Sequence, residues 1–119
     1  MLTLDIEKVG DVAVVECKGR IVRSEAAFTL RKAVTSQTNA RIVVLDLTEV
    51  RAIEGGGLGM LRFLQRWAQD HHLQLKLFDP TDSVKKTLER NSSTKFDVAT
   101  FDEMMALLAK ADSRYGVAA

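Results

Sequence analysis

The chain contains few of the residues that cross-link a fold or interrupt its helices and strands. Its 119 residues include one cysteine, Cys17, and one proline, Pro80. A single cysteine cannot form an intrachain disulfide, and its place in an apolar, strand-like run predicts a buried, unreactive thiol. The shortage of proline and the 46% share of hydrophobic residues are typical of one ordered globular domain rather than of a disordered segment.

An excess of charge of one sign and long apolar runs are also missing. There are 17 basic and 16 acidic residues, a formal net charge of +1, and this balance argues against a nucleic-acid partner. No apolar run approaches the roughly 20 residues that cross a bilayer. The first residues alternate apolar and polar and lack the basic and apolar regions of a signal peptide. We therefore expect a cytoplasmic protein without direct membrane insertion.

Glycine is scarce as well, but four of the seven glycines fall within residues 55–59. They follow a β-branched apolar run at 42–45, typical of a central parallel strand, and a polar turn. Helical spacing begins after Gly57, so the sequence predicts a helix whose N-terminus carries no side chains. Such an end presents unpaired N–H groups to a partner's atoms, a phosphate or a carboxylate. Residues 53–63 contain no hydroxyl, thiol, lysine or histidine, which favours binding over covalent chemistry.

The glycines do not match known nucleotide-binding loops. A P-loop needs Gly-Lys-Ser/Thr, with the lysine on the phosphates and the hydroxyl on magnesium, whereas Met60 follows Gly59 here. The dinucleotide fingerprint needs a third glycine where Met60 stands. The adjacent His71 and His72 point to different faces of a helix end and make a poor metal pair. We therefore expect no catalytic residues, no cofactor, no metal site and no enzymatic activity.

Apolar spacing predicts strands alternating with helices. Residues 2–6 and 12–17 form a hairpin, whose acidic residues, Asp11 included, are expected on a solvated face. The remaining elements are expected as strands at 42–45, 73–77 and 96–98, and as helices after Ser24, after the glycines, after Asp82 or Ser83, and at the capping box 100–103. The order predicts a single α/β domain over residues 1–112, with a mostly parallel sheet of four to five strands, an N-terminal hairpin and helices packed against it. Residues 113–119 are expected to fray.

The helix after the glycines is apolar on more than half of its circumference. One stripe follows Leu58 and Leu61, and a second stripe contains Met60, Phe63 and Trp67. The second stripe is interpreted as core packing in the first place, because a helix lying across a sheet under another helix shows the same pattern. The alternative is that it forms a surface for a partner.

Residues spread over nearly the whole chain carry a family resemblance. Residues 54–59, Glu-Gly-Gly-Gly-Leu-Gly, look like a signature Asp-Ser-Ser/Thr-Gly-Leu-Gly, and they follow Val-Val-Leu-Asp-Leu at 43–47. Gly-Arg-Ile at 19–21, Phe-Asp-Pro at 78–80 and the helix at 100–108 add to the match. On these residues the chain resembles the STAS family, which contains the anti-sigma factor antagonists of bacteria and domains at the ends of sulfate transporters. The resemblance implies a single STAS-like domain.

In that family, the first serine of the signature is phosphorylated by a partner serine kinase that doubles as an anti-sigma factor, and phosphorylation blocks binding. By position, the phosphoacceptor falls on Gly55 and the next hydroxyl on Gly56, and glycine carries no phosphate. The preceding aspartate falls on Glu54, whose charge is expected to stabilise the helix dipole rather than to mimic half of a phosphate. Residues 57–59 keep the family pattern.

The resemblance implies an anti-sigma factor antagonist (an anti-anti-sigma factor) that serves transcription regulation and signal transduction in bacteria by protein binding. The implied partner is an anti-sigma factor of the serine-kinase type, and a homodimer is compatible with the family. The alternative is a STAS subunit of a larger assembly, either a stress-signalling complex or a transporter accessory. The binding residues implied by position are Arg23, Ser24, Glu54, Gly55, Gly56, Gly57 and Leu58.

Overall fold

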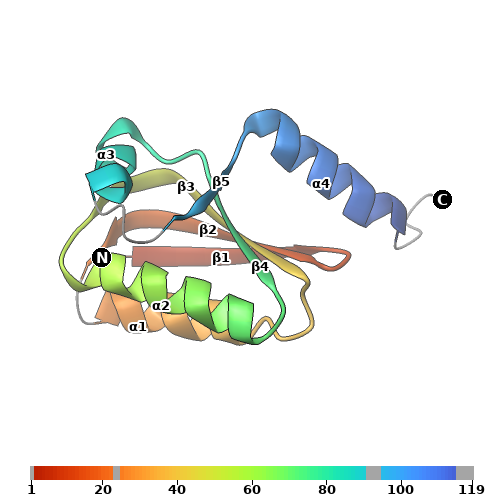
Figure 1. Cartoon of the computed structure of the whole chain (residues 1–119), viewed down its shortest axis with the longest axis horizontal. Helices are drawn as coiled ribbons and strands as arrows, with labels where there is room; N and C mark the ends of the chain where they lie inside the picture. Colours follow the sequence, from red (N-terminus) through yellow and green to blue (C-terminus); the bar gives the residue numbers. More distant parts are fainter. Residues whose placement is uncertain (1, 23–24, 91–94, 115–119) are drawn as a thin grey trace.

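The computed structural model describes residues 2–22, 25–90 and 95–114, which form a five-stranded sheet and four helices (Figure 1). The order along the chain is β1 (Leu2–Val9), β2 (Val12–Ile21), α1 (Glu25–Thr35), β3 (Ile42–Ile53), α2 (Gly56–Asp70), β4 (Gln74–Phe78), α3 (Asp82–Arg90), β5 (Asp97–Ala99) and α4 (Phe101–Arg114). The strands lie in the sheet in the same order, with β1 antiparallel to β2 and the other neighbours parallel. The predicted α/β class, mostly parallel sheet and N-terminal hairpin are confirmed.

The hairpin pairs residue by residue from Leu2 opposite Gly19 to Val9 opposite Val12. Strand β2 runs on to Ile21, four residues past its predicted end at Cys17, and register shifts interrupt its pairing with β3 on both sides of Gly19. Irregularities of this kind bend a strand and increase its local twist. They also bring the end of β2 level with the end of β3.

Strand β3 is the centre of the sheet and is longer than the sequence predicts. The expected polar turn before the glycines is wrong, because the strand continues through Thr48 and Glu49 to Ile53. Val50 and Ile53 are buried, so the polar residues lie between buried ones in a strand rather than in a turn. The glycines therefore start directly at the end of the central strand.

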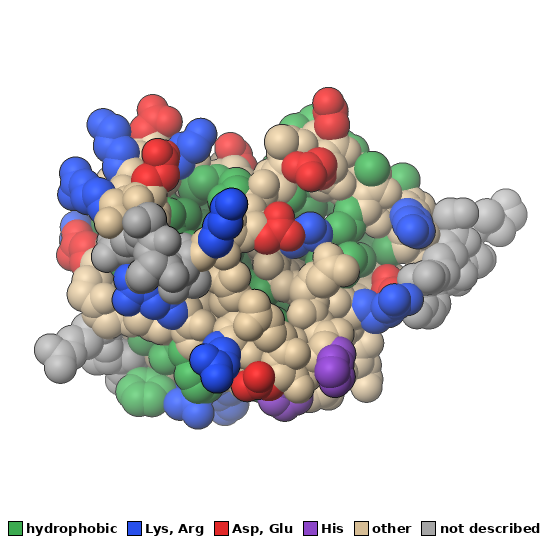
Figure 2. All heavy atoms as spheres, in the orientation of Figure 1, with side chains coloured by type: hydrophobic (Ala, Val, Ile, Leu, Met, Phe, Trp, Pro, Cys, Tyr) green, Lys and Arg blue, Asp and Glu red, His purple; other side chains and the backbone are tan. Residues whose placement is uncertain are grey.

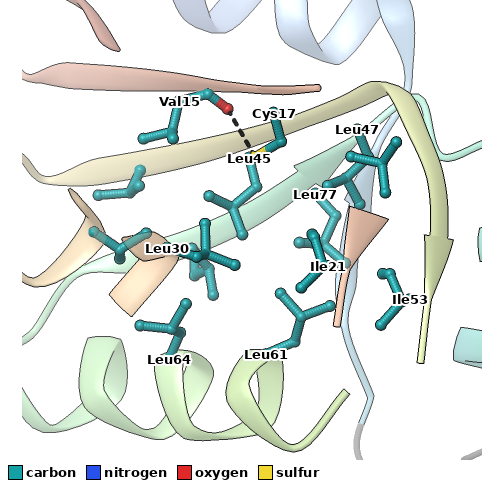
Figure 3. Close-up of a cluster of buried hydrophobic side chains, with 14 of the residues drawn as sticks. Val15, Cys17, Ile21, Leu30, Leu45, Leu47, Ile53, Leu61, Leu64 and Leu77 are labelled. Atoms are coloured by element: carbon teal, nitrogen blue, oxygen red, sulfur yellow. Dashed lines mark hydrogen bonds between the residues drawn. The ribbon is translucent and has the colours of Figure 1, made fainter. Parts of the chain in front are cut away.

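The main hydrophobic core lies between the sheet and the two neighbouring helices α1 and α2, which cover one face (Figure 1). Figure 3 shows side chains of β2, β3 and β4 meeting Leu30 of α1 and Leu61 and Leu64 of α2. Full burial of such a leucine contributes about 1.5–3 kcal/mol. Helix α4 covers part of the opposite face, where Met104 and Ala111 pack against Val12 and Val44.

Cys17 lies in the main core, as predicted. Its side chain is buried and its Sγ donates to the backbone oxygen of Val15 at 3.6 Å (Figure 3). Burial, with the charge of Asp46 as a second cause, raises the pKa of this thiol to about 12. The thiol therefore stays protonated near neutral pH, which confirms the expectation of an unreactive cysteine.

The helix starts give one confirmation and one correction. The capping box at the start of α4 is confirmed by hydrogen bonds in both directions between Thr100 and Glu103. The expected cap of α3 at Asp82 or Ser83 is wrong, because the Thr81 hydroxyl accepts from the Val84 N–H at 3.4 Å. That hydroxyl also reaches the Val50 oxygen at 3.3 Å, so a tertiary contact selects the cap.

Two further expectations concern charged and terminal residues. The solvated position expected for Asp11 is wrong: this residue is only 8% exposed, and Arg41 Nε lies 3.8 Å from its carboxylate. Helix α4 extends to Arg114, two residues past the expected limit of the domain at 112. Residues 115–119 lie outside the described ranges, so the fraying of the tail stays a prediction.

Candidate partner-binding site

The glycine-rich segment begins where the two central parallel strands end together. Ile21 at the end of β2 pairs with Ile53 at the end of β3, and the Glu54 N–H donates to the Ile21 oxygen at 3.0 Å. This hydrogen bond continues the sheet pairing by one residue and anchors the start of the loop. The segment therefore lies at the carboxyl ends of the strands, the edge at which α/β sheets bind ligands.

Gly55 supplies the sharp change of direction from strand to helix. Its φ is 52° and its ψ is −120°, a combination that an L-residue with a side chain rarely adopts. The chain turns here within one residue, and Gly56 is already the first residue of α2. The backbone conformation itself thus favours glycine at position 55.

Gly57 is required for a different reason, which is close packing of the helix against β2. A Cβ at this position would overlap the carbonyl oxygen of Ile21 and lie 2.8 Å from its carbonyl carbon. The Gly57 N–H donates to the Glu54 oxygen at 2.9 Å, so the first turn is also tied to the preceding loop. Gly57 therefore fixes the N-terminus of α2 against the end of the sheet.

Among the described residues, no side chain caps this N-terminus. No side-chain hydrogen bond is made by the N-cap residue Gly55, and no acidic residue lies in the first turn of α2. Residues 54–56 and Gly59 are exposed, and a Cβ at Gly59 would meet no atom within 4 Å. Exposed main chain at an open helix N-terminus is what the sequence predicts for this segment.

Glu54 is directed toward a residue that the sequence did not point to. Its Oε1 lies 3.3 Å from Nη2 of Arg20, and both side chains are more than half exposed. A pair this exposed contributes at most about 1 kcal/mol, and it engages the Glu54 carboxylate with a residue near the end of β2. Only the cross-strand register brings Arg20 next to Glu54, and no spacing in the sequence indicates it.

The other expected binding residues divide into two groups. Arg23 and Ser24 lie outside the described residues, so their place beside the glycines stays a prediction. Leu58 is only 8% exposed and belongs to the main core, so its side chain holds the domain together. What remains accessible is the carboxylate of Glu54 and the main chain of the glycines.

Two properties of the described residues bear on the kind of site. No group of three or more histidine, cysteine, aspartate or glutamate side chains gathers there in a way that could hold a metal ion. None of the described helices combines the length and the apolar character needed to cross a membrane. The features gathered at this edge are thus a short exposed loop, one ion pair and an open helix end.

The fold and this strand–glycine–helix junction define a STAS domain. The STAS domain family matches residues 3–106, and the chain belongs to this family. No curated protein matches the chain closely enough to count as a relative. The suspected resemblance is confirmed.

Solved structures with this fold include proteins of more than one kind. The unphosphorylated form of the anti-sigma factor antagonist SpoIIAA, from Bacillus, has a TM-score of 0.74 at 14% identity, covering 98% of this chain and 100% of that one. A putative anti-sigma factor antagonist from Thermotoga maritima has a TM-score of 0.75 at 20% identity, covering 89% and 94%. A sulfate transporter family protein from Wolinella succinogenes has a TM-score of 0.64 at 16% identity, covering 89% and 93%.

These likenesses establish the architecture and leave the partner open. At such identities a shared fold does not fix a shared function, because function resides in the site. Both antagonists and a transporter family protein have the fold, so the choice between them depends on this chain's own residues.

Proposed function

We propose that this chain is an anti-sigma factor antagonist-like module that binds a protein partner in bacterial transcription or stress regulation. The partner is an anti-sigma factor of the serine-kinase type, and the module works in the cytoplasm without chemistry of its own. Its contact surface is the segment 54–58, with Arg23 and Ser24 beside it. Family membership, together with structural neighbours that are themselves such antagonists, supports this choice.

One observation carries the proposal: α2 begins with exposed glycines and no side-chain cap. A capped end uses its own side chain on its N–H groups, whereas this end, apart from the Gly57 N–H that donates to the Glu54 oxygen, keeps them for another molecule. The carboxylate of Glu54 is paired with Arg20 and makes no capping hydrogen bond to this end. The surface therefore suits a partner that brings carbonyl or carboxylate oxygens to the helix end.

The proposed module differs from switched members of its family in how it is regulated. Gly55 and Gly56 carry no hydroxyl, so a kinase cannot add phosphate at either position. A module of this kind stays competent to bind, and regulation must act through its partner or its amount. Binding should therefore be the same with ATP as with ADP, unless the nucleotide changes the partner itself.

The direct test is binding to a co-encoded serine-kinase-type anti-sigma factor, measured by calorimetry with ATP and with ADP. We expect specific binding that is about tenfold tighter, or about 1.4 kcal/mol, for Glu54→Arg, since this change puts a positive charge beside the open helix end that receives the partner's carbonyl or carboxylate oxygens. Glu89→Arg is the matched control, because Glu89 is an exposed residue of α3. An absence of binding with either nucleotide would reject the proposed partner class.

A second test restores a hydroxyl to the loop. Gly55→Ser and Gly56→Ser are incubated with the kinase and ATP, and phosphate uptake is followed by mass spectrometry, with circular dichroism confirming that each variant is folded. Uptake by Gly55→Ser, against none by the wild type, would show that the kinase still recognises this segment. No uptake by either folded variant would indicate that the partner class has changed.

A second candidate function, a subunit of a larger assembly, is favoured by the exposed aromatic side chains Phe28 and Phe63 on α1 and α2. A permanent interface would cover such rings. Acrylamide quenching of Trp67 fluorescence is measured on the protein expressed alone and on the protein co-expressed with its neighbouring genes. Comparison of the two samples distinguishes the two candidate functions. Protection of Trp67 in a stable co-purified complex supports an assembly, and unchanged quenching supports the transient module.

A further inference from the structure

Helices α1 and α2 carry an exposed aromatic strip that the site at the α2 N-terminus does not use. Phe28 of α1 is 64% exposed and Phe63 of α2 is 41% exposed. Met60 and Trp67 belong to the same stripe of α2, but both are partly buried against the main core. The stripe interpreted as core packing is thus divided, with two residues packed inward and Phe63 left at the surface.

Arg31 joins the two helices across this strip. Its Cζ lies 4.7 Å from the centroid of the Phe63 ring, a cation–π contact worth about 0.5–1 kcal/mol at an exposed site. The guanidinium therefore lies on the ring, where its N–H groups remain able to bind a carboxylate. We call the surface formed by Phe28, Arg31 and Phe63, with the exposed parts of Met60 and Trp67, the α1–α2 seam.

The charge around the seam is of one sign, unlike the chain as a whole. Residues 26–35 of α1 and 56–69 of α2 contain no acidic residue and four basic ones, Arg31, Lys32, Arg62 and Arg66. The nearest acidic residues in these helices are Glu25, the first residue of α1, and Asp70, the last residue of α2. The whole chain has a net charge of only +1. Along the lower edge of Figure 2, over α1 and α2, hydrophobic and basic side chains lie side by side, and acidic and histidine side chains follow further along the same edge.

We propose that the α1–α2 seam is a second docking surface, for an acidic segment of a protein partner that also carries apolar side chains. Its aromatic rings would take the apolar side chains and its guanidinium groups the carboxylates. The surface is separate from residues 54–57 and does not require an anti-sigma factor as the partner. Charge complementarity selects the occupant, since an acidic segment gains from basic residues that a neutral one would leave unused.

Two other occupants fit this charge pattern less well. A second copy of the chain seated seam to seam would bring Arg31, Lys32 and Arg66 against their own counterparts, and like charges across an interface cost free energy. An anionic membrane would match the sign of the charge, but insertion requires a continuous apolar face. Here, arginine lies over one of the two exposed rings.

The test begins with a phage-displayed library of random 16-residue peptides, selected for binding to the full chain. Binding of the enriched peptides is then measured through Trp67 fluorescence. We expect enriched peptides with net negative charge and at least one large apolar residue, and binding that weakens as salt rises. Phe63→Ser and Arg31→Glu should each weaken binding at least tenfold. Phe101→Ser and Lys85→Glu are the matched controls, because Phe101 is 65% exposed and Lys85 is exposed on other helices.

The outcomes separate this proposal from its rivals. Enrichment of peptides without negative charge, no enrichment, or equal losses from Phe63→Ser and Phe101→Ser would overturn it. If the protein floats with vesicles of phosphatidylserine and phosphatidylcholine and Phe63→Ser abolishes this flotation, the seam binds a membrane instead. If sedimentation shows self-association and Arg31→Glu changes it, the seam binds a second copy of the chain instead. Glu54→Arg should leave peptide binding unchanged, so failure at the glycine site and failure at the seam are distinguishable.

Discussion

Helices α2 and α4 begin in opposite ways within one small domain. At α4, the Thr100 N–H donates to Glu103 Oε1 at 2.8 Å and the Glu103 N–H donates to the Thr100 hydroxyl at 3.1 Å. At α2, the N-cap is a glycine without a side-chain hydrogen bond and the first turn carries no acidic residue. One helix closes its N-terminus with its own side chains, and the other leaves it open.

The difference shows where this chain gives up stability. A glycine in place of a side-chain cap costs a few tenths of a kcal/mol, and each glycine within the helix costs about 1 kcal/mol relative to alanine. Such sums are substantial against a total stability of about 5–15 kcal/mol. The close contact between Gly57 and Ile21 explains one of the glycines through packing. The turn after β3 explains Gly55, and the proposed function accounts for Gly56, which is exposed at the first residue of α2.

The largest expected effect is from Gly57→Ala. The added methyl group would overlap the Ile21 carbonyl and push the start of α2 from the end of the sheet. Overpacking of this kind costs about 3 kcal/mol, which urea unfolding followed by circular dichroism will measure. A loss under about 1 kcal/mol would mean that the helix start tolerates a shift, and that α2 is less firmly held than the contact indicates.

Gly59→Ala is the matched control for that variant. It is an exposed glycine two residues further along the same helix, where an added methyl group would meet open space. The same substitution should therefore stabilise the protein by up to about 1 kcal/mol through helix propensity alone. The two alanine variants together separate a glycine needed for packing from one that only lowers the stability of α2.

Gly55→Ser is expected to destabilise the protein by about 2 kcal/mol, because its backbone lies in a region that is strained for a residue with a side chain. Gly56→Ser, one residue on and within the helix, should cost less than about 1 kcal/mol. Thermal unfolding of both variants gives the comparison. Equal costs at the two positions would show that the loop relaxes, and that the serine of switched relatives is accommodated without strain.

Thr100→Ala tests the closed end. It removes the hydroxyl that accepts from the Glu103 N–H and should cost about 1 kcal/mol. Thr38→Ala, on the exposed turn after α1, serves as a control that should change stability little. Faster hydrogen exchange of the first-turn amides of α4, with those of α2 unchanged, would confirm that the effect is local.

The smallest effect is a pH dependence confined to α4. Hydrogen bonds from Thr100, the backbone N–H first and the hydroxyl second, hold the pKa of Glu103 below its ordinary value. A lowered pKa means that this contribution to stability is complete above the ordinary glutamate value and is lost as pH falls through the folded value. The stability difference between wild type and Glu103→Gln should therefore shrink from pH 7 to pH 2. A constant difference would contradict a role for the charged form.

Much of this architecture follows from local sequence, and the failures have physical causes. The hairpin and the α4 capping box depend on neighbours within a few residues, so alternation and spacing predict them. The cap of α3 at Thr81 and the burial of Asp11 depend on Val50 and Arg41, which are distant along the chain. Periodicity cannot indicate contacts of that kind.

The candidate site shows the same division. The glycine run and the resemblance together predict the open helix end, because both depend on consecutive residues. The ion pair between Arg20 and Glu54 requires the register of β2 against β3, which no spacing reveals. The exposure of Phe63, beside partly buried Met60 and Trp67, depends on how α1 and α2 lie against each other.

The order of the strands has a consequence for how the molecule is made. Because β1 to β5 lie in the sheet in the order of their synthesis, the neighbour of each new strand has already been made when that strand leaves the ribosome. Every pairing then closes a loop of modest length, which keeps the entropy of closure low and favours rapid folding. The nascent chain can thus extend its sheet from one edge, without inserting a late strand between two early ones.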